Sequence, residues 1–350
     1  MTTAERRSDE SRALRMAVIG CGPVGTLHAQ AIAASPHAVL VAVCEVDPQR
    51  RDEAQRRFDV HAYERVERLL TDESLDAVAI ATPDHLHLQP ALEAIAAGCH
   101  VFCEKPLANS VPEAGQIVRA AAERNVRLGV DYNRRFAFGY RTAKRLVDEG
   151  AIGTVRHSRL TVSDRTPPPR VARHPLVIFT TLLTHHFDLL RCFAGEVRSI
   201  RAEAGQPTIG SLLRNVTLSF EFAGGAQGTI VAGYRDELTR TVESLDLGGT
   251  VGTIVVEDVT GPVTWTSRDG QSTQSFSAQD HGGEETFYDS LIAHVQAFIE
   301  HVARGAAPPV TGEDGLVGMR LAAAAIESIE SGTTIEVEAS LAGEGEAPAL

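Results

Sequence analysis

The chain has 350 residues, which corresponds to about two domains at roughly 150 residues each. Its formal net charge of −13 argues against a nucleic-acid-binding surface, because phosphate binding depends on clustered Lys and Arg. No apolar run approaches the ~20 residues needed to cross a bilayer, and the charged N-terminus lacks the apolar stretch of a secretory signal. We therefore expect a cytoplasmic globular protein that binds neither nucleic acid nor membrane.

The cysteines number five, and they lack the paired spacing of a metal site. They are Cys21, Cys44, Cys99, Cys103 and Cys192. Several lie in apolar, strand-like runs, so we interpret them as small buried side chains in a reducing compartment. The sequence predicts no metal site.

Short apolar runs alternate with segments of helical periodicity in the first third of the chain. The predicted strands are 15–20, 39–45, 76–81, 100–104 and 127–131, and the predicted helices are 24–35, 48–58, 87–97 and 112–125. This alternation is typical of βαβ units around a parallel sheet. We expect a disordered lead-in over 1–13 and a doubly wound, Rossmann-type dinucleotide-binding domain over 14–135.

Strands dominate the chain beyond residue 150. Strands are predicted at 155–163, 197–204, 216–222, 227–234, 242–247 and 253–257, and helices at 181–193, 287–304 and 314–331. Strict alternation of apolar and polar residues over 216–222 indicates a sheet with one covered face. We expect an α+β domain with a large open, mostly antiparallel sheet over 136–337, and a disordered tail over 338–350. The Pro-rich segment 166–175 is a candidate lid or an ordinary surface connection.

The sequence GCGPVG at 20–25 matches the G-x-G-x-x-G pattern. It follows an apolar strand and opens a helix in the first βαβ unit, and this context makes the short motif informative. Gly20 permits the tight turn, Gly22 lets the backbone approach a pyrophosphate, and Gly25 allows close helix–strand packing. Together with Pro23 and Val24 they predict a loop that holds the diphosphate at the positive end of a helix.

Glu45 ends the second predicted strand, twenty residues after Gly25. An acidic side chain there accepts hydrogen bonds from an adenosine ribose and repels a 2′-phosphate, so we favour NAD over NADP. Arg50 and Arg51 lie nearby, and an arginine can neutralise a 2′-phosphate, which leaves NADP open. Asp47 is a second acidic candidate that we expect instead to cap the following helix.

Glu104-Lys105-Pro106 follows the fourth predicted strand, at the sheet edge where open α/β sheets bind ligands. Lys105 would then lie beside the nicotinamide. The positive charge of the oxidised ring and partial burial would both favour loss of the lysine proton, which suits proton transfer. The alternative is an exposed lysine at a strand end.

Six motifs resemble those of the glucose–fructose oxidoreductase, inositol dehydrogenase and rhizopine-catabolism (Gfo/Idh/MocA) family. They are GCGPVG at 20–25, ATPDHLH at 81–87, CEKPLA at 103–108, YNRRF at 132–136, THHFD at 184–188 and PVTGEDG at 309–315. The resemblance, over residues 14–337, implies a Rossmann domain and a mixed α/β domain whose open sheet joins subunits into a homodimer or homotetramer. It implies that the cofactor is bordered by Thr82, Pro83, His87, Glu104 and Lys105.

The resemblance assigns Lys105 the polarisation or protonation of the reacting oxygen. The H-x-x-D spacing of the family motif fits His185 and Asp188. In a helix, Thr181, His185 and Asp188 share one stripe, whereas His186 falls on an apolar stripe and is interpreted as structural. Asp188 is expected to orient the His185 imidazole.

One position departs from the family pattern. Many members carry Asp four residues before this histidine, and here that residue is Thr181. The glycine-rich run that usually precedes the helix is also absent, and LVIFTTLL at 176–183 replaces it. A threonine cannot share a proton as a carboxylate can. The proton relay then depends on Lys105 and His185, or on a carboxylate from elsewhere such as Asp164.

Further polar residues at strand ends or in the Pro-rich segment are candidates to hold a hydroxyl-rich substrate or to clamp a phosphate. With Asp164 and Thr181, they are Asn133, Arg134, Arg165, His174, Tyr234 and Arg235. The sequence thus favours an NAD(P)-dependent dehydrogenase that acts on a sugar, sugar derivative or cyclitol. The alternative is a dinucleotide-binding sensor that regulates a sugar pathway through protein partners, but a sensor has no need of Lys105 and His185.

Overall fold

The computed structural model of the chain describes residues 12–168, 171, 174, 176–205, 212–279 and 286–337. The expected tail 338–350, and the expected lead-in except for residues 12 and 13, lie outside the described residues. The chain divides into two compact units. The first contains Met1–Asn109, Glu113–Asp131 and Leu291–Gly315, and the second contains Ser110–Pro112, Tyr132–Ser290 and Leu316–Leu350.

The first unit is built on a parallel sheet with the order β3-β2-β1-β4-β5-β6 among the described residues. The strands are β1 (Leu14–Ile19), β2 (Ala38–Cys44), β3 (His61–Tyr63), β4 (Ala77–Ile80), β5 (His100–Cys103) and β6 (Leu128–Val130). Strands β2 and β3 lie on one side of β1, and β4, β5 and β6 lie on the other. The strand order therefore reverses between β1 and β4, which makes this a topological switch point. Ligands of doubly wound sheets bind at the carboxyl ends of the strands at such a point.

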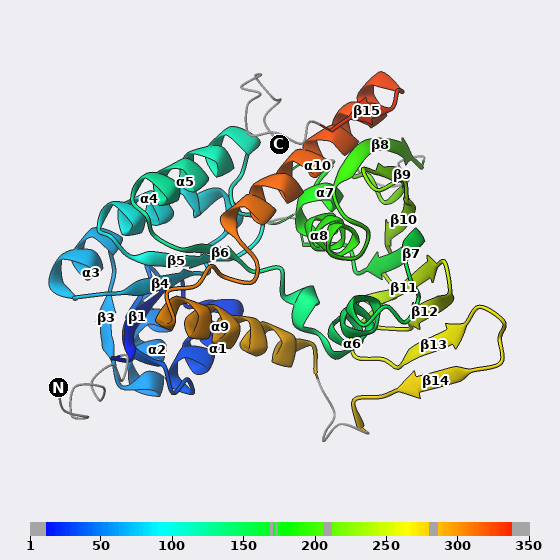
Figure 1. Cartoon of the computed structure of the whole chain (residues 1–350). Helices are drawn as coiled ribbons and strands as arrows, with labels where there is room; N and C mark the ends of the chain where they lie inside the picture. The colour runs from blue at the N-terminus through cyan, green and yellow to red at the C-terminus, as the bar shows by residue number, and fades with distance from the viewer. Residues whose placement is uncertain are drawn as a thin grey trace, which may run out of the picture. The chain divides into compact units, whose positions relative to one another are not determined.

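Helices cover both faces of this sheet (Figure 1). They include α1 (Pro23–Ala33), α2 (Pro48–Phe58), α3 (Val66–Asp72), η1 (Asp84–Leu86), α4 (Leu88–Ala96) and α5 (Val111–Glu123). The predicted helix 48–58 is confirmed at both ends, and the other predicted elements of this region are confirmed to within two residues. The short β3 and α3 were not predicted, because neither is long enough to show a clear period.

Helix α9 (Phe287–Ala303) corrects the predicted domain boundaries. The range 136–337 was expected to form one domain, but Leu291–Gly315 belongs to the first unit. Val295 and Phe298 of α9 are buried in the same apolar core as Ile32 of α1 and Phe102 of β5. The periodicity of α9 predicts a helix with an apolar stripe, but it does not specify which core that stripe enters.

The second unit contains a nine-stranded sheet, again counted over the described residues, with the order β14-β13-β12-β11-β7-β10-β9-β8-β15. The strands are β7 (Val155–Asp164), β8 (Val197–Ala204), β9 (Asn215–Phe222), β10 (Gln227–Tyr234), β11 (Val242–Gly249), β12 (Gly252–Val256), β13 (Val263–Ser267), β14 (Thr273–Phe276) and β15 (Ile335–Glu336). Strands β7 and β10 are parallel and the other pairs are antiparallel, which confirms the predicted sheet.

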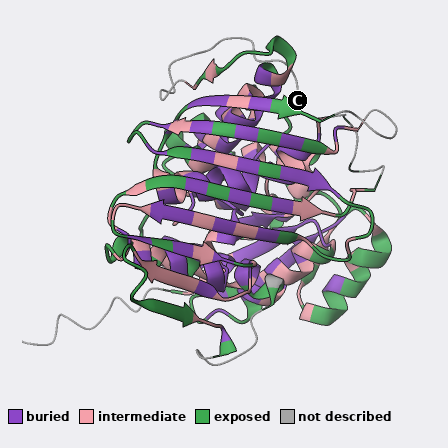
Figure 2. Ribbon diagram, turned by 90° about the vertical axis from the view of Figure 1, so that its right-hand side faces the viewer, coloured by how far each residue is buried: buried purple, intermediate pink, exposed green. Residues whose placement is uncertain are grey.

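One face of this sheet packs against helices in a large apolar core. The helical elements are η2 (Asn133–Phe136), α6 (Phe138–Asp148), α7 (Ile178–Thr181), α8 (Leu183–Ala194) and α10 (Gly312–Ser331). Buried and exposed residues alternate along the strands, as Figure 2 shows, so the second face is open. None of the helices among the described residues is both long and apolar enough to span a membrane.

Candidate active site

The glycine-rich loop follows β1 at the carboxyl edge of the first sheet. Gly20 has φ +93°, and a Cβ there would lie 2.7 Å from the Ala81 carbonyl oxygen. A Cβ on Gly25 would lie 1.8 Å from the Gly20 carbonyl oxygen, so only glycine fits at either position. A Cβ on Gly22 would meet nothing within 4 Å. The loop is therefore closed against the protein at Gly20 and Gly25 and faces open space at Gly22.

Helix α1 begins directly after this loop. Its N-cap residue is Gly22, no side chain caps its first turn, and Pro23 occupies the first turn. Backbone N–H groups at an uncapped helix start, together with the helix dipole, favour an anion. The open space at Gly22 and the uncapped turn at Val24 fit the diphosphate of a dinucleotide.

Glu45 lies directly after β2 and is 8% exposed. Its two carboxylate oxygens accept hydrogen bonds from the backbone N–H groups of Cys21 (2.8 Å) and Asp47 (3.0 Å). The carboxylate therefore fastens the glycine-rich loop to the loop after β2. Asp47 accepts hydrogen bonds from the N–H groups of Gln49 and Arg50, which confirms the predicted cap of α2.

The arginines near Glu45 are oriented differently from each other. The Arg51 guanidinium donates to the Glu45 carbonyl oxygen (2.8 Å), whereas Arg50 lines a groove of about 540 Å³ along α1 and α2. Gly22 and Pro23 also line this groove. Arg50 is thus the arginine placed toward the diphosphate end of the loop.

His87 joins two loops at this edge. Its ring nitrogens lie 2.9 Å from the Thr82 carbonyl oxygen and 2.8 Å from that of Pro106. The side chain is buried, and burial lowers the pKa of His87 although both carbonyl contacts oppose the shift. His87 therefore ties the loop of Thr82 and Pro83 to the segment that carries Lys105.

Glu104 and Lys105 follow β5 directly. The Glu104 N–H donates to the Ile80 carbonyl oxygen, which extends the sheet, and a Glu104 carboxylate oxygen accepts from the Lys105 N–H (3.0 Å). Lys105 is half-buried. This places the lysine at the carboxyl edge of the sheet that also carries the glycine-rich loop.

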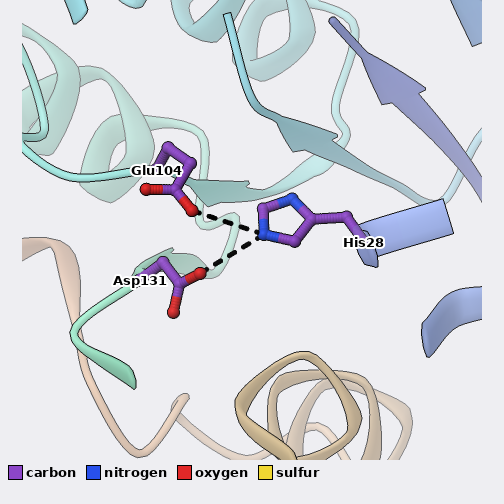
Figure 3. A group of neighbouring side chains, drawn as sticks. All are labelled: His28, Glu104 and Asp131. Carbon is purple, nitrogen blue, oxygen red and sulfur yellow. Dashed lines mark hydrogen bonds and ion pairs between the residues drawn. The ribbon is translucent and has the colours of Figure 1, made fainter. Parts of the chain in front are cut away.

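Two residues beside Glu104 were not predicted from the sequence. His28 of α1 lies between the carboxylates of Glu104 and Asp131 (Figure 3). The ligand-type atoms of these three side chains lie within 4.8 Å of one another, and we interpret them as an ion-pair network. His28 follows Gly25 by one helical turn, and Asp131 ends the predicted strand 127–131. Their places near the glycine-rich loop and at a strand end could therefore have marked both residues as site candidates.

In the second unit, His185 lies on α8 and is 7% exposed. The edge of its ring packs near Tyr132, with 5.8 Å between the ring centroids. Thr181, one turn earlier, shares a hydrogen bond of 2.8 Å with the Tyr234 hydroxyl. Tyr234 pairs with Asp164 in the parallel register of β10 and β7. The second unit therefore brings several predicted residues to the ends of two parallel strands.

Glu243 forms the centre of a buried network in this unit. Its carboxylate binds the Arg134 Nε (3.1 Å), the Tyr140 hydroxyl (2.6 Å) and the His186 Nε2 (3.1 Å). Arg134 was expected in the substrate pocket, but it is only 3% exposed. Its guanidinium is paired with the buried Glu243 carboxylate, which makes the burial of both charges possible. Asn133 is equally buried.

The remaining predicted residues are exposed or have other partners. Arg235 donates to the Glu237 carboxylate (2.8 Å), and the Arg165 N–H donates to the Asp164 carboxylate. His174 is exposed, in a segment that is only partly described. Asp188, expected to orient His185, forms a two-pronged ion pair with Arg135.

Comparison with known proteins points to one family over both units. Residues 14–132 match the GFO_IDH_MocA model, described as "Oxidoreductase family, NAD-binding Rossmann fold", and residues 140–255 match the GFO/IDH/MocA C-terminal domain. Myo-inositol 2-dehydrogenase of Thermotoga maritima is 29% identical over 344 residues, covering 93% of this chain and 99% of that protein. Levoglucosan dehydrogenase of Pseudarthrobacter phenanthrenivorans is 27% identical over 287 residues, covering 69% of this chain and 73% of that protein.

A solved structure supports the same relationship. The crystal structure of a probable dehydrogenase from Thermotoga maritima superposes with a TM-score of 0.81 at 28% identity, over 93% of this chain and 99% of that one.

Proposed function

Because the chain belongs to the Gfo/Idh/MocA family of NAD-binding oxidoreductases, we propose that it transfers hydride between NAD and a CH–OH carbon of a cyclitol or related sugar. One observation supports this most directly. The open glycine-rich loop, the Glu45 carboxylate and Lys105 all follow strands of one parallel sheet and share its carboxyl edge. This edge is where a dinucleotide and its reaction partner bind in doubly wound sheets.

We assign the proton chemistry to Lys105 and His185. Bound NAD would supply the hydride acceptor, and the protein would contribute orientation and electrostatics. In the oxidative direction, the Lys105 amine takes the hydroxyl proton while the substrate C–H hydride leaves, and His185 assists that transfer. Thr181 cannot share a proton as a carboxylate can, and its hydroxyl hydrogen-bonds with the Tyr234 hydroxyl and the Val177 carbonyl oxygen.

The substrate class rests on relatives. Their names cite myo-inositol and levoglucosan, both rich in hydroxyl groups. Thr181, Tyr234 and Asp164 offer hydroxyl and carboxylate groups suited to such a compound. Two of the arginines expected to clamp a phosphate are already paired, Arg134 with Glu243 and Arg235 with Glu237, so we favour an uncharged polyol.

The test is NADH absorbance during incubation of the purified protein with NAD and a panel of cyclitols, free sugars, anhydrosugars and sugar phosphates. We expect turnover on a cyclitol or free sugar, a loss of at least ~10²-fold in Lys105→Ala, and a smaller loss in His185→Gln. Lys144→Ala is the control and should retain full activity, because this lysine of α6 is half-buried and paired with Asp148 on its own helix.

The outcomes separate the alternatives. Activity retained in Lys105→Ala would overturn the lysine assignment. Tight NADH binding without turnover in either direction would instead favour the sensor. NADPH bound more tightly than NADH would overturn the choice of NAD.

We also propose a cytoplasmic location and a homo-oligomer formed through the open face of the nine-stranded sheet. Support for the oligomer comes from Val231 and Val242, apolar residues of that sheet that are 46% and 43% exposed.

A further inference from the structure

Four titratable side chains from distant parts of the sequence converge within the first unit. They are His28 of α1, Glu104 after β5, Asp131 after β6 and His294 of α9. His28, Asp131 and His294 are each at most 2% exposed. Ionisable groups are rarely buried so deeply unless they are paired. The proposed function uses Glu104 only as a neighbour of Lys105, so the other three residues require an explanation.

Their contacts form a continuous chain. The His28 Nε2 lies 3.3 Å from one Asp131 oxygen and 3.6 Å from one Glu104 oxygen (Figure 3). The second Asp131 oxygen lies 2.9 Å from the His294 Nδ1, and the second Glu104 oxygen accepts the Lys105 N–H. These contacts therefore link His294 of α9, through Asp131, His28 and Glu104, to the backbone of Lys105.

Phe102 orients both imidazoles. Its ring packs edge-on against His28, at 5.4 Å between centroids, and against His294, at 5.0 Å. Phe102 precedes Glu104 by two residues, so in a strand both side chains lie on the same face of the sheet. The Phe102 ring therefore packs against both imidazoles of the network.

The charges in this network depend on one another. Burial alone would lower the pKa of His28, but hydrogen bonds to Asp131 and Glu104 raise it to about 9. Burial raises the pKa of Glu104 to about 7, the negative charge of Asp131 adds to the rise, and His28 opposes it. Despite burial, His28 and His294 hold the pKa of Asp131 below its usual range. At neutral pH, Glu104 is therefore the carboxyl group that titrates.

We propose that His28, Asp131 and His294 are positioning residues for the hydride-transfer reaction, which hold the Glu104 carboxyl group against the Lys105 backbone and set the charge beside that lysine. This inference rests on the proposed role of Lys105. An ionised Glu104 favours the protonated lysine, and a neutral Glu104 releases that constraint. The groups that face Glu104 from the surrounding elements are His28, Asp131 and the Cys103 thiol. Burial raises the pKa of that thiol, and the charges of Glu104 and Asp131 raise it further.

The first test needs neither cofactor nor substrate. Imidazole ¹⁵N NMR of the unloaded full-length protein should show a protonated His28 imidazole at pH 8, assigned by its absence in His28→Gln. In Asp131→Asn that signal should become neutral by pH 8. A neutral His28 at pH 7 in the wild type, or an unchanged signal in Asp131→Asn, would overturn the proposal. So would a stoichiometric metal ion found by elemental analysis of the purified protein.

The second test separates positioning from stability, with NAD and myo-inositol, or the best panel substrate, as the reactants. His294→Gln should lower kcat at least ~10-fold and leave the KM for NAD within about twofold. The matched control is His301→Gln on the same helix, where the imidazole lies 2.8 Å from the Ala297 carbonyl oxygen of its own helix, and it should match the wild type. Glu104→Gln should remove a titration near pH 7 from the kcat/KM profile.

A purely structural network gives a different pattern. A lower Tm in His294→Gln with unchanged kcat, or a titration near pH 7 that persists in Glu104→Gln, would contradict the proposal. Full activity in Lys105→Ala would refute the lysine assignment alone, because the NMR result is independent of it.

Discussion

At the scale of single residues, the glycines of the dinucleotide loop have separable roles. A methyl group on Gly25 would overlap the Gly20 carbonyl oxygen, whereas one on Gly22 would point into open space. We expect Gly25→Ala to lower the free energy of unfolding by about 1–3 kcal/mol or more, as overpacking does. Gly22→Ala should leave the Tm within about 1 °C of the wild type and weaken NADH binding at least ~10-fold.

Thermal unfolding and NADH fluorescence titration measure the two effects on the same samples. If Gly22→Ala bound NADH with wild-type affinity, the diphosphate would not approach the loop at that position. Equal losses of stability in the two variants would show that the loop has a packing role alone.

Glu45 is held in place by two backbone N–H groups, from Cys21 and Asp47. Glu45→Gln removes its charge and turns an amide NH₂ toward one of those donors. We expect the ratio of NADPH to NADH affinity to rise at least ~10-fold, because the repulsion of a 2′-phosphate is lost. Fluorescence titration with both cofactors measures this ratio. The exposed Glu64→Gln is the control, and an unchanged ratio in Glu45→Gln would remove Glu45 from cofactor selection.

At the scale of elements, Glu243 of β11 joins η2, α6 and α8 through Arg134, Tyr140 and His186. Despite burial, these partners, Arg134 foremost, lower the pKa of Glu243 to about 2. A carboxyl group whose pKa is depressed on folding stabilises the protein above its unfolded pKa, and this contribution is lost as the pH falls through the folded pKa.

We therefore expect Glu243→Gln to lower the free energy of unfolding by about 3 kcal/mol at pH 7. The difference from the wild type should shrink as the pH falls from the ordinary glutamate range near 4.5 toward 2. Urea unfolding at several pH values measures it. Glu221→Gln, which removes an exposed pair with Arg198, should change stability by less than about 0.5 kcal/mol. A pH-independent difference would show that packing, not charge, holds these elements together.

Periodicity and turn residues predicted most elements of both units because their apolar stripes are long. The period of β9 is one example, and α5, where Ala114, Ile117, Val118 and Ala121 are buried, is another. Helix α6 carries an equally clear stripe, with Tyr140, Ala143 and Leu146 buried, and could have been predicted. The division of the predicted helix 181–193 could not, because the break between α7 and α8 falls at Leu182 without Gly or Pro.

The candidate site was predictable where a motif carries its own geometry, as in the glycine-rich loop and at Glu45. The partners of buried polar groups were not. Arg134 reads from sequence as a substrate ligand, but its partner Glu243 is 109 residues away. Likewise, the contact between Asp131 and His294 depends on how α9 packs, which local sequence does not determine.

At the scale of the whole molecule, the open sheet face leads to a prediction about assembly. Light scattering should give a mass that is a multiple of the 37.5 kDa chain. Val231→Glu, placed on the open face, should shift the mass toward that of one chain, because burying an unpaired charge in an interface is costly. Val46→Glu, at a 76% exposed site of the first unit, should not. A single-chain mass for the wild type would refute assembly through this sheet.

The return of Leu291–Gly315 to the first unit has a consequence for biosynthesis. The ribosome makes the first sheet early, but Val295 and Phe298, which complete the core around Phe102, emerge only after the nine-stranded sheet is nearly finished. Until then the nascent chain leaves that apolar face without its cover. The first unit therefore cannot fold to completion in the order in which it is translated, and chaperones and proteases can reach it throughout that interval.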